Sequence, residues 1–165
     1  MPPMAASSFD ALYASEYAAV VRVAFALTGR LAVAEELSQE AFLSAYRRWD
    51  QIGRYDDPAA WVRRVVTNRC VSAWRRGFTE ARLLARLGQE PSTYVVGNEQ
   101  DDALWRAVRR LPARQRQVIA LVVVDDRSVA DAAVVLEISE DSVRTHLRRA
   151  KAHLAKRLGE PESDR

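Results

Sequence analysis

The spacing of apolar residues constrains the fold of this chain more than any other feature of its sequence. Along most of the chain, apolar residues recur every three or four positions, which is the period of an amphipathic α-helix. In the first such segment the periodic positions are Phe9, Leu12, Tyr13, Tyr17, Val20, Val21, Ala24 and Leu27. Glycine and proline, which interrupt helices, number only 6 each in 165 residues. The sequence therefore predicts an all-α fold built from long helices.

Capping signals set the ends of the helices predicted in the first half of the chain. These helices cover residues 9–27, 32–49 and 58–76, with a short connection at 51–56 and a short helical stretch at 79–87. Gly29 can adopt the left-handed conformation that commonly ends a helix. Asp57 and Pro58 together indicate a helix start, because aspartate caps the first turn and proline fits the first helical position.

The second half of the chain has the pattern of a helix-turn-helix. One helix is predicted to close at Leu111, and Pro112 opens the next. Ser128 then caps a short helix, and Ser139 caps a long one that ends near Leu158. The spacing favours a DNA-binding helix-turn-helix over an ordinary helical hairpin.

The last helix is predicted to have an apolar inner face and a polar outer face. The inner positions, spaced by three and four residues, are Val143, Leu147, Ala150 and Leu154. The outer positions are Ser142, Arg144, Thr145, His146, Arg148 and Arg149. These outer side chains suit phosphates and the guanine edges of a major groove.

An acidic segment separates the two helical halves. Residues 88–102 follow no helical period and carry four acidic residues and no basic one. The sequence therefore predicts two small helical domains joined by a flexible linker. The predicted division is a disordered N-terminus at 1–8, a first domain at 9–87, the linker at 88–102, a second domain at 103–158 and a disordered tail at 159–165.

The net charge of +3 hides two strongly basic helices. The helix from Trp61 to Arg76 carries five arginines and no acidic residue, and the last helix carries six lysine and arginine residues with both histidines of the chain. One basic helix alone is more often a solvated surface, but two of them, one within a helix-turn-helix, indicate binding to phosphates.

Several classes of function are excluded by what the sequence lacks. The single cysteine, Cys70, rules out an internal disulfide and a cysteine-rich zinc site. Neither a glycine-rich phosphate loop nor metal-ligand spacing occurs, so no enzyme activity, cofactor or metal is expected. No signal peptide is recognisable and no stretch approaches the roughly 20 apolar residues of a membrane helix, so a cytoplasmic protein is expected.

Four segments together resemble the extracytoplasmic-function (ECF, group IV) sigma factors of bacterial RNA polymerase. They are Ala34 to Phe42, Trp61 to Asn68, Trp74 to Arg76, and Leu111 to Val118 followed by the helix-turn-helix. The composition is similar to the actinobacterial, SigE-like branch. The resemblance implies sigma region 2 in the first domain, sigma region 4 in the second, and a role in promoter recognition and DNA strand opening.

The resemblance also implies three groups of contact residues. Core polymerase, through its β′ clamp, would be bound by Glu36, Leu37, Gln39, Glu40 and Phe42. The −10 element, where strands separate, would meet Arg63, Arg64, Asn68, Arg69, Trp74, Arg75 and Arg76. The −35 element would meet the outer face of the last helix, named above. The implied partners are core RNA polymerase (β′ clamp and β flap) and promoter DNA, and an anti-sigma factor is common in the family.

Alternatives remain open from the sequence alone. Leu37, Phe42 and Trp61 could be core residues, and the whole chain could be a helix-turn-helix regulator that never contacts polymerase. The chain also departs from the family pattern: Glu137 stands where glycine commonly makes the turn, and Ser38, Ser72 and His146 replace apolar, acidic and basic residues.

Overall fold

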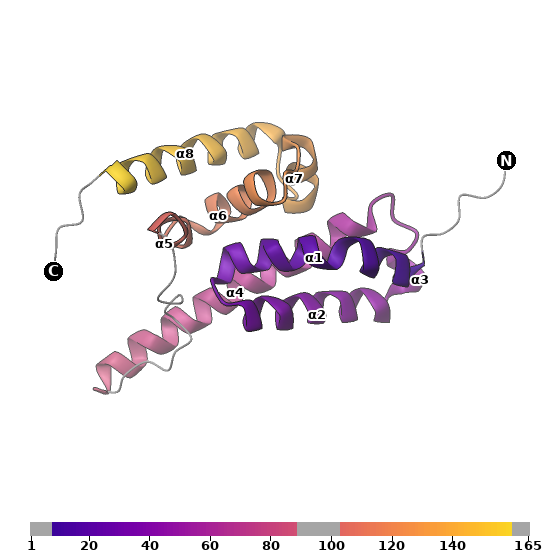
Figure 1. The fold of residues 1–165 in the computed structure, drawn as a ribbon, viewed down its shortest axis with the longest axis horizontal. Coiled ribbons are helices and arrows are strands. Elements are labelled where there is room, and N and C mark those ends of the chain that lie inside the picture. Colours follow the sequence, from indigo (N-terminus) through magenta and orange to yellow (C-terminus); the bar gives the residue numbers. More distant parts are fainter. Residues whose placement is uncertain (1–7, 89–102, 160–165) are drawn as a thin grey trace.

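A computed structural model of the chain describes residues 8–88 and 103–159, and this part of the chain is helical with no strand (Figure 1). We call residues 8–88 the N-terminal block and residues 103–159 the C-terminal block. The predicted disordered ends and the predicted acidic linker lie, except for their residues at the borders, outside the described residues.

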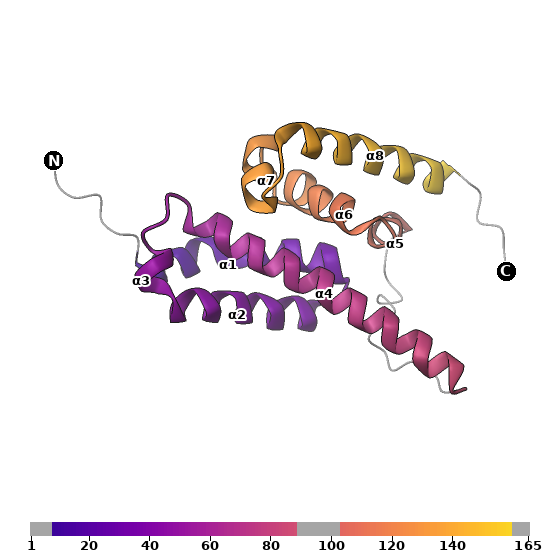
Figure 2. The same cartoon turned by 180° about the vertical axis from the view of Figure 1, so that it is seen from behind.

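Four helices form the N-terminal block. They are α1 (Phe9–Thr28), α2 (Leu31–Arg47), α3 (Trp49–Ile52) and α4 (Pro58–Arg86). The first two form an antiparallel hairpin, and α4 packs against both (Figure 2). The predicted caps are confirmed: Gly29 has φ 69° and its N–H donates to the Phe25 carbonyl at 2.8 Å. The Asp57 carboxylate accepts from the Ala60 N–H at 2.9 Å, which fixes the start of α4.

Two elements of this block differ from their predicted extent. The chain forms the short helix α3 where the sequence suggested a helix end and a connection. In addition, α4 runs for 29 residues, through Gly77, and so joins two segments predicted separately. The last part of α4 extends beyond the other helices (Figure 1).

The C-terminal block contains α5 (Ala103–Arg109), α6 (Ala113–Ile119), the π-helical turn η1 (Ala120–Val124), α7 (Val129–Leu136) and α8 (Glu140–Gly159). Both predicted serine caps are confirmed. The Ser128 hydroxyl accepts from the Asp131 N–H at 3.0 Å, and the Ser139 hydroxyl accepts from the Ser142 N–H at 3.1 Å. The π turn was not predicted; it closes with the Asp125 N–H donating to the Ala120 carbonyl.

The two blocks share one apolar core. Val118 and Leu121 of the C-terminal block belong to the same buried cluster as Val20, Val62 and Val66 of the N-terminal block. A second, smaller cluster lies beneath α8 and consists of Val108, Leu111, Ile119 and Ala150. The C-terminal block therefore lies directly on α1 and α4 (Figures 1 and 2), an arrangement that the predicted two domains and flexible linker left open.

The length and composition of α1 bear on the prediction that the chain has no membrane helix. By length and composition, α1 is long and apolar enough to cross a membrane, although no such stretch was predicted from the sequence. However, Val20, Val23 and Ala24 of α1 are fully buried against the rest of the protein. In this structure α1 is the central core helix of the fold.

Candidate nucleic-acid and polymerase interfaces

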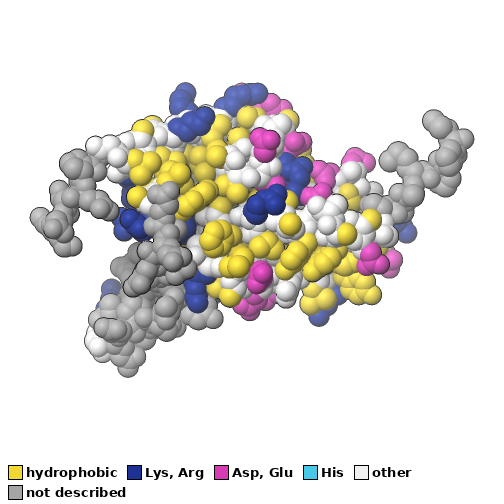
Figure 3. Space-filling view, in the orientation of Figure 1, with side chains coloured by type: hydrophobic (Ala, Val, Ile, Leu, Met, Phe, Trp, Pro, Cys, Tyr) yellow, Lys and Arg dark blue, Asp and Glu magenta, His cyan; other side chains and the backbone are white. Residues whose placement is uncertain are grey.

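The outer face of α8 is the most exposed basic surface of the helix-turn-helix. Arg148, Arg149 and Lys151 are exposed, whereas Val143 and Ala150 on the opposite side are fully buried. Leu147 and Leu154 are half-buried on the inner side. The predicted inner face of the last helix is therefore confirmed, whereas of the predicted outer residues Arg144, Arg148 and Arg149 are exposed. Figure 3 shows lysine and arginine side chains along the outer edge of this block.

The turn before α8 is made by a residue in an unusual conformation. Glu137 has φ 54° and ψ 44°, the left-handed region that favours glycine, and it ends α7. The Ile138 N–H donates to the Ala133 carbonyl at 3.2 Å and completes the turn. The conformational cost of having glutamate instead of glycine at this turn therefore arises from the left-handed backbone of Glu137.

The first turns of α8 are less accessible than the middle of the helix. Arg144 is exposed but forms ion pairs with Glu140 and Asp141 at 2.9 and 3.0 Å. Such exposed pairs contribute little, about 0–1 kcal/mol, so Arg144 can exchange them for a phosphate. The remaining predicted residues of this group, Ser142, Thr145 and His146, are half-buried.

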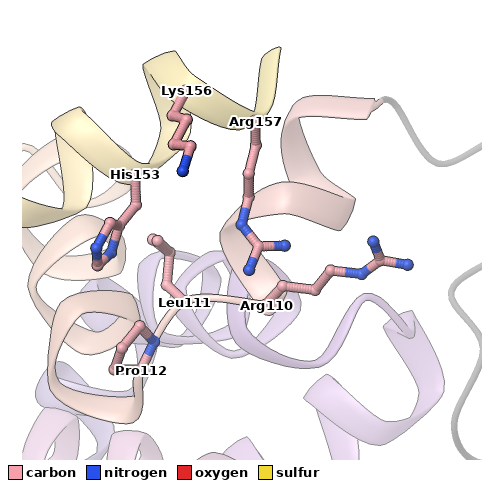
Figure 4. Close-up of a pocket in the computed structure, with 6 residues that line it drawn as sticks. All are labelled: Arg110, Leu111, Pro112, His153, Lys156 and Arg157. Carbon is pink, nitrogen blue, oxygen red and sulfur yellow. The ribbon is translucent and has the colours of Figure 1, made fainter. Parts of the chain in front are cut away.

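An open hollow lies on the inner side of the C-terminal half of α8. It is lined by Arg110, Leu111, Pro112, His153, Lys156 and Arg157 (Figure 4). The Nδ1 atom of His153 lies 2.9 Å from the Gln115 amide oxygen, which holds the ring against α6. Arg110, which was not predicted from the sequence, directly follows α5 and adds a third cation beside Lys156 and Arg157.

Arg63 of α4 is not a surface residue. Its side chain is 1% exposed; its Nε donates to Asp125 at 2.6 Å and its Nη2 pairs with Glu16 at 2.7 Å. Burial alone would lower the pKa of Arg63, but the hydrogen bonds and charges of Asp125 and Glu16 outweigh it and raise that pKa. Contrary to the prediction, Arg63 cannot reach a DNA phosphate in this conformation.

Arg64 is also occupied, by the end of α7. Its Nε donates to the Val135 carbonyl at 3.0 Å and its Nη2 to the Val134 carbonyl at 2.8 Å. A third contact, at 3.0 Å, pairs its Nη1 with the Glu137 carboxylate. Arg64 therefore satisfies carbonyl groups at the C-terminal end of a helix, where a cation is favoured, instead of facing solvent as predicted.

The other predicted −10 residues divide into paired and exposed groups. Arg69 pairs with Glu40 of α2 at 2.7 Å, and the Asn68 amide oxygen accepts from Gln117 at 3.4 Å. The Arg116 guanidinium carbon lies 5.0 Å from the centre of the Trp74 ring, a cation–π contact. Arg75 and Arg76 are exposed, and they are the predicted arginines of α4 best placed to meet DNA in this conformation.

The predicted polymerase contacts on α2 differ in how far their side chains are buried. Glu36 and Gln39 are exposed, Glu40 is half-buried beside Arg69, and Leu37 is buried. Phe42 is 2% exposed and lies in an aromatic cluster with Phe9, Tyr13 and Tyr17, at centroid distances of 5.0 to 6.4 Å. Contrary to its predicted role as an apolar anchor, Phe42 is a core residue.

The exposed apolar residues of α2 were missed by the sequence analysis. Leu43 is 46% exposed and Tyr46 is 62% exposed. Leu43 follows Gln39 by four positions and Glu36 by seven, so these three side chains share one stripe of the helix. The helical period counted from Glu36 would have identified Leu43 instead of Phe42.

Comparison with known families matches both blocks. Residues 12–77 match the family model "Sigma-70 region 2", and residues 101–154 match "Sigma-70, region 4". The ECF RNA polymerase sigma factor SigM of Mycobacterium tuberculosis is 34% identical over 159 residues, covering 92% of this chain and 78% of the relative. The RNA polymerase sigma-E factor of Streptomyces coelicolor is 30% identical over 126 residues, covering 76% and 71%.

Solved structures show the same arrangement of helices. The sigma factor RpoE of Bartonella quintana, solved with the anti-sigma factor NepR, matches with a TM-score of 0.69 at 21% identity and covers 95% of this chain and 98% of that one. CnrH, solved with the cytosolic domain of CnrY, matches with a TM-score of 0.67 at 23% identity, covering 92% and 87%. Both region matches and these relatives confirm the predicted resemblance: the chain belongs to the ECF RNA polymerase sigma factors.

Proposed function

We propose that this sigma factor binds core RNA polymerase through the exposed stripe of α2 and reads promoter DNA with α8 and α4. The observation that carries the proposal is the exposed basic face of α8 on a helix-turn-helix, in a chain whose other block matches sigma region 2. A regulator that acts without polymerase would leave that second match unexplained, so it is not favoured.

The upstream, −35 element is assigned to α8. A major groove about 12 Å wide admits a helix of this kind, and arginine can bond two acceptors of a guanine edge at once. Arg148 and Arg149 lie in the middle of the helix and are exposed, so they are the leading candidates. Arg144 lies one turn before Arg148 and supports the same contact through phosphates.

The downstream, −10 element is assigned to α4. Separating DNA strands costs about 1.4 kcal/mol per stacked step, and turning a base out adds a few kcal/mol. The protein recovers this energy only if it binds the single strand better than the duplex. Asn68 offers an amide for a base edge, and the exposed Arg75 and Arg76 offer cations for the strand backbone.

Core polymerase is assigned to the stripe of Glu36, Gln39 and Leu43, with Tyr46 beside it. The carboxylate of Glu36 suits a basic partner helix, and the exposed apolar surface of Leu43 and Tyr46 supplies the contact first expected from Phe42. The proposal assigns no catalytic step to this chain and places it in the cytoplasm with its polymerase. It also includes an anti-sigma factor among the partners, as for the matched sigma factor RpoE, which was solved in complex with NepR.

The test is run-off transcription with purified core polymerase on genomic promoter fragments. Replacing both Arg148 and Arg149 by alanine should reduce promoter binding by the holoenzyme at least tenfold and leave association with core unchanged. Arg22→Ala, an exposed arginine of α1, is the control and should change neither. Failure of the chain to associate with core, or full transcription by the double variant, would overturn the proposal.

A further inference from the structure

A small cavity lies where α4 passes the turn between α1 and α2 and continues beyond it (Figure 2). We call it the turn pocket. Its volume is about 250 Å³, and its lining residues are Thr28, Arg30, Val33, Ala73, Trp74, Arg76 and Gly77. Both charged residues in its lining, Arg30 and Arg76, are cations, and no acidic residue is among them. The turn pocket is therefore a positively charged cavity with one aromatic wall.

A buried cation lies behind the aromatic wall. The Arg116 side chain of α6 is buried, and its guanidinium carbon lies 5.0 Å from the centre of the Trp74 ring. Its Nη1 donates to the Arg109 carbonyl at 3.0 Å, whereas its Nε is buried without a hydrogen-bond partner in the part of the chain that the structure describes. Arg116 also forms no ion pair within residues 8–88 and 103–159.

The cations on either side of Trp74 also lack a carboxylate. Arg75 and Arg76 are exposed, and neither forms an ion pair with another described residue. Burial lowers the pKa of Arg116, and the positive charge of Arg75 acts in the same direction. Like charges thus gather around one indole ring without a counter-charge, an arrangement that a bound anion would stabilise.

The size and donors of the turn pocket indicate which anion fits. The Thr28 hydroxyl donates to the Ala24 carbonyl at 2.8 Å, so the charged donors of the pocket are those of Arg30 and Arg76. The planar fork of an arginine can bond two oxygens of a phosphate group at once. Sites for drug-sized ligands measure roughly 300–1,000 Å³. A cavity of about 250 Å³ therefore suits a small anion, and several nearby cations favour one that carries more than one charge.

We propose that the turn pocket binds a small free phosphate-bearing anion of the size and charge of pyrophosphate. Arg30 and Arg76 bind its oxygens, Trp74 forms the wall, and Arg116 attracts it through its charge. The inference goes beyond the proposed function, because the turn pocket contains no residue of the polymerase stripe or of the outer face of α8. It shares only Arg76 with the proposed −10 contacts.

The test is isothermal titration calorimetry of inorganic pyrophosphate into the full chain, in magnesium-free buffer at low salt. Val33→Glu places a carboxylate in the pocket, and Val33→Gln is the matched control with nearly the same shape and no charge; Val33 is half-buried there. Arg30→Gln removes one cation of the lining. Neither Val33 nor Arg30 is a proposed contact with DNA or polymerase. Circular dichroism verifies that each variant is folded.

We expect Val33→Gln to bind pyrophosphate nearly as the wild type does, and Val33→Glu and Arg30→Gln to bind it about tenfold more weakly, since a hydrogen bond to a charged group is lost or opposed. Sulfate at the same ionic strength should bind more weakly than pyrophosphate. Equal binding of pyrophosphate by Val33→Glu and Val33→Gln would overturn the proposal, and so would equal affinity for sulfate.

A single-stranded DNA oligonucleotide is titrated into the same variants to identify the source of the phosphate. If binding of the oligonucleotide, and not of pyrophosphate, depended on Arg30 and Val33, the pocket would hold a phosphate of the strand and the proposal would be wrong. A failure of the proposed function is distinct from these outcomes, because it would show as lost association with core or lost transcription by the wild type.

Discussion

At the scale of single residues, burial decides the chemistry of Cys70. Cys70 lies on the buried side of α4 and is 1% exposed. Burial raises the pKa of its thiol to about 12, although the nearby Arg116 acts in the opposite direction. A thiol in this environment stays protonated and does not act as a nucleophile. Cys70 is therefore a small core residue, and no redox role follows from it.

We predict that Cys70 reacts with a thiol reagent only when the protein unfolds, so alkylation at neutral pH should follow the unfolding rate. The raised pKa of Cys70 also determines whether the free energy of unfolding rises or falls with pH. The native state keeps the thiol proton above pH 9, where the unfolded thiol loses it, so stability falls as pH rises from about 9 to about 12. The slope is at most about 1.4 kcal/mol per pH unit.

The measurement is urea unfolding at several alkaline pH values for the wild type and Cys70→Ala. The variant is less stable throughout because it leaves a cavity, but it should show a shallower decline with pH. Rapid alkylation of the folded protein, or equal slopes for both proteins, would contradict the prediction.

Burial also explains why the arginines of α4 could not be sorted from the sequence. The helical period places Arg63 near Val62 and Val66 on a half-apolar face, but the residue that buries it, Asp125, is 62 positions away. The same holds for Phe42, whose core position depends on contacts with α1. Residue types and spacing identified the basic helix, whereas the availability of each cation depends on tertiary contacts.

At the scale of elements, the turn between α7 and α8 combines a local strain with a long-range contact. The left-handed backbone of Glu137 is unfavourable for a residue with a side chain, and its carboxylate pairs with Arg64 of α4. The pair is largely exposed, with 68% of the glutamate side chain accessible, so it contributes little. The backbone cost should therefore dominate any substitution here.

We predict that Glu137→Gly stabilises the protein by about 1 kcal/mol relative to Glu137→Gln, because glycine adopts positive φ without a steric penalty. Both variants lose the ion pair with Arg64, so their difference isolates the backbone term. Urea unfolding of both proteins gives this difference. Equal stability of the two variants would show that the turn carries no conformational cost.

Elements were predictable where their signals are local. The caps at Gly29, Asp57, Ser128 and Ser139 were recognised because each satisfies backbone groups within a few residues of itself. The short helix α3, the π turn η1 and the continuous course of α4 through Gly77 were missed, because propensity near a helix end is weak and packing decides the outcome.

At the scale of the whole molecule, the two blocks share one apolar core, so we expect them to unfold as one cooperative unit. A close contact illustrates the fit: a Cβ on Gly29, in the turn between α1 and α2, would lie 2.7 Å from the guanidinium carbon of Arg109 at the end of α5. Arg109 is buried there, and burial lowers its pKa. Neither block's sequence contains a signal for this contact, so the sequence predicted two domains and a linker but not how the domains pack together.

We predict that Gly29→Ala destabilises both blocks together, by about 1–2 kcal/mol more than Gly88→Ala does. Gly88 is the matched control, since it has the same φ of 69° but open space around it. Hydrogen exchange followed by mass spectrometry reports the two blocks separately. Loss of protection in the N-terminal block alone would show that the blocks unfold independently and would contradict the shared core.

The pair between Arg69 and Glu40 connects α4, which we propose to face DNA, with α2, which we propose to face polymerase. The Arg69 guanidinium lies 2.7 Å from the Glu40 carboxylate and donates a hydrogen bond to the Ser44 hydroxyl at 3.2 Å. Both contacts hold the guanidinium against α2. A cationic partner that takes the Glu40 carboxylate leaves Arg69 without its counter-ion, beside Asn68. Binding of polymerase to Glu40 would thus leave the existing positive charge of Arg69 unpaired on the side of α4 that we propose to face DNA. We therefore expect substitutions at Glu40 to change the affinity for DNA, although Glu40 is not among the proposed DNA contacts.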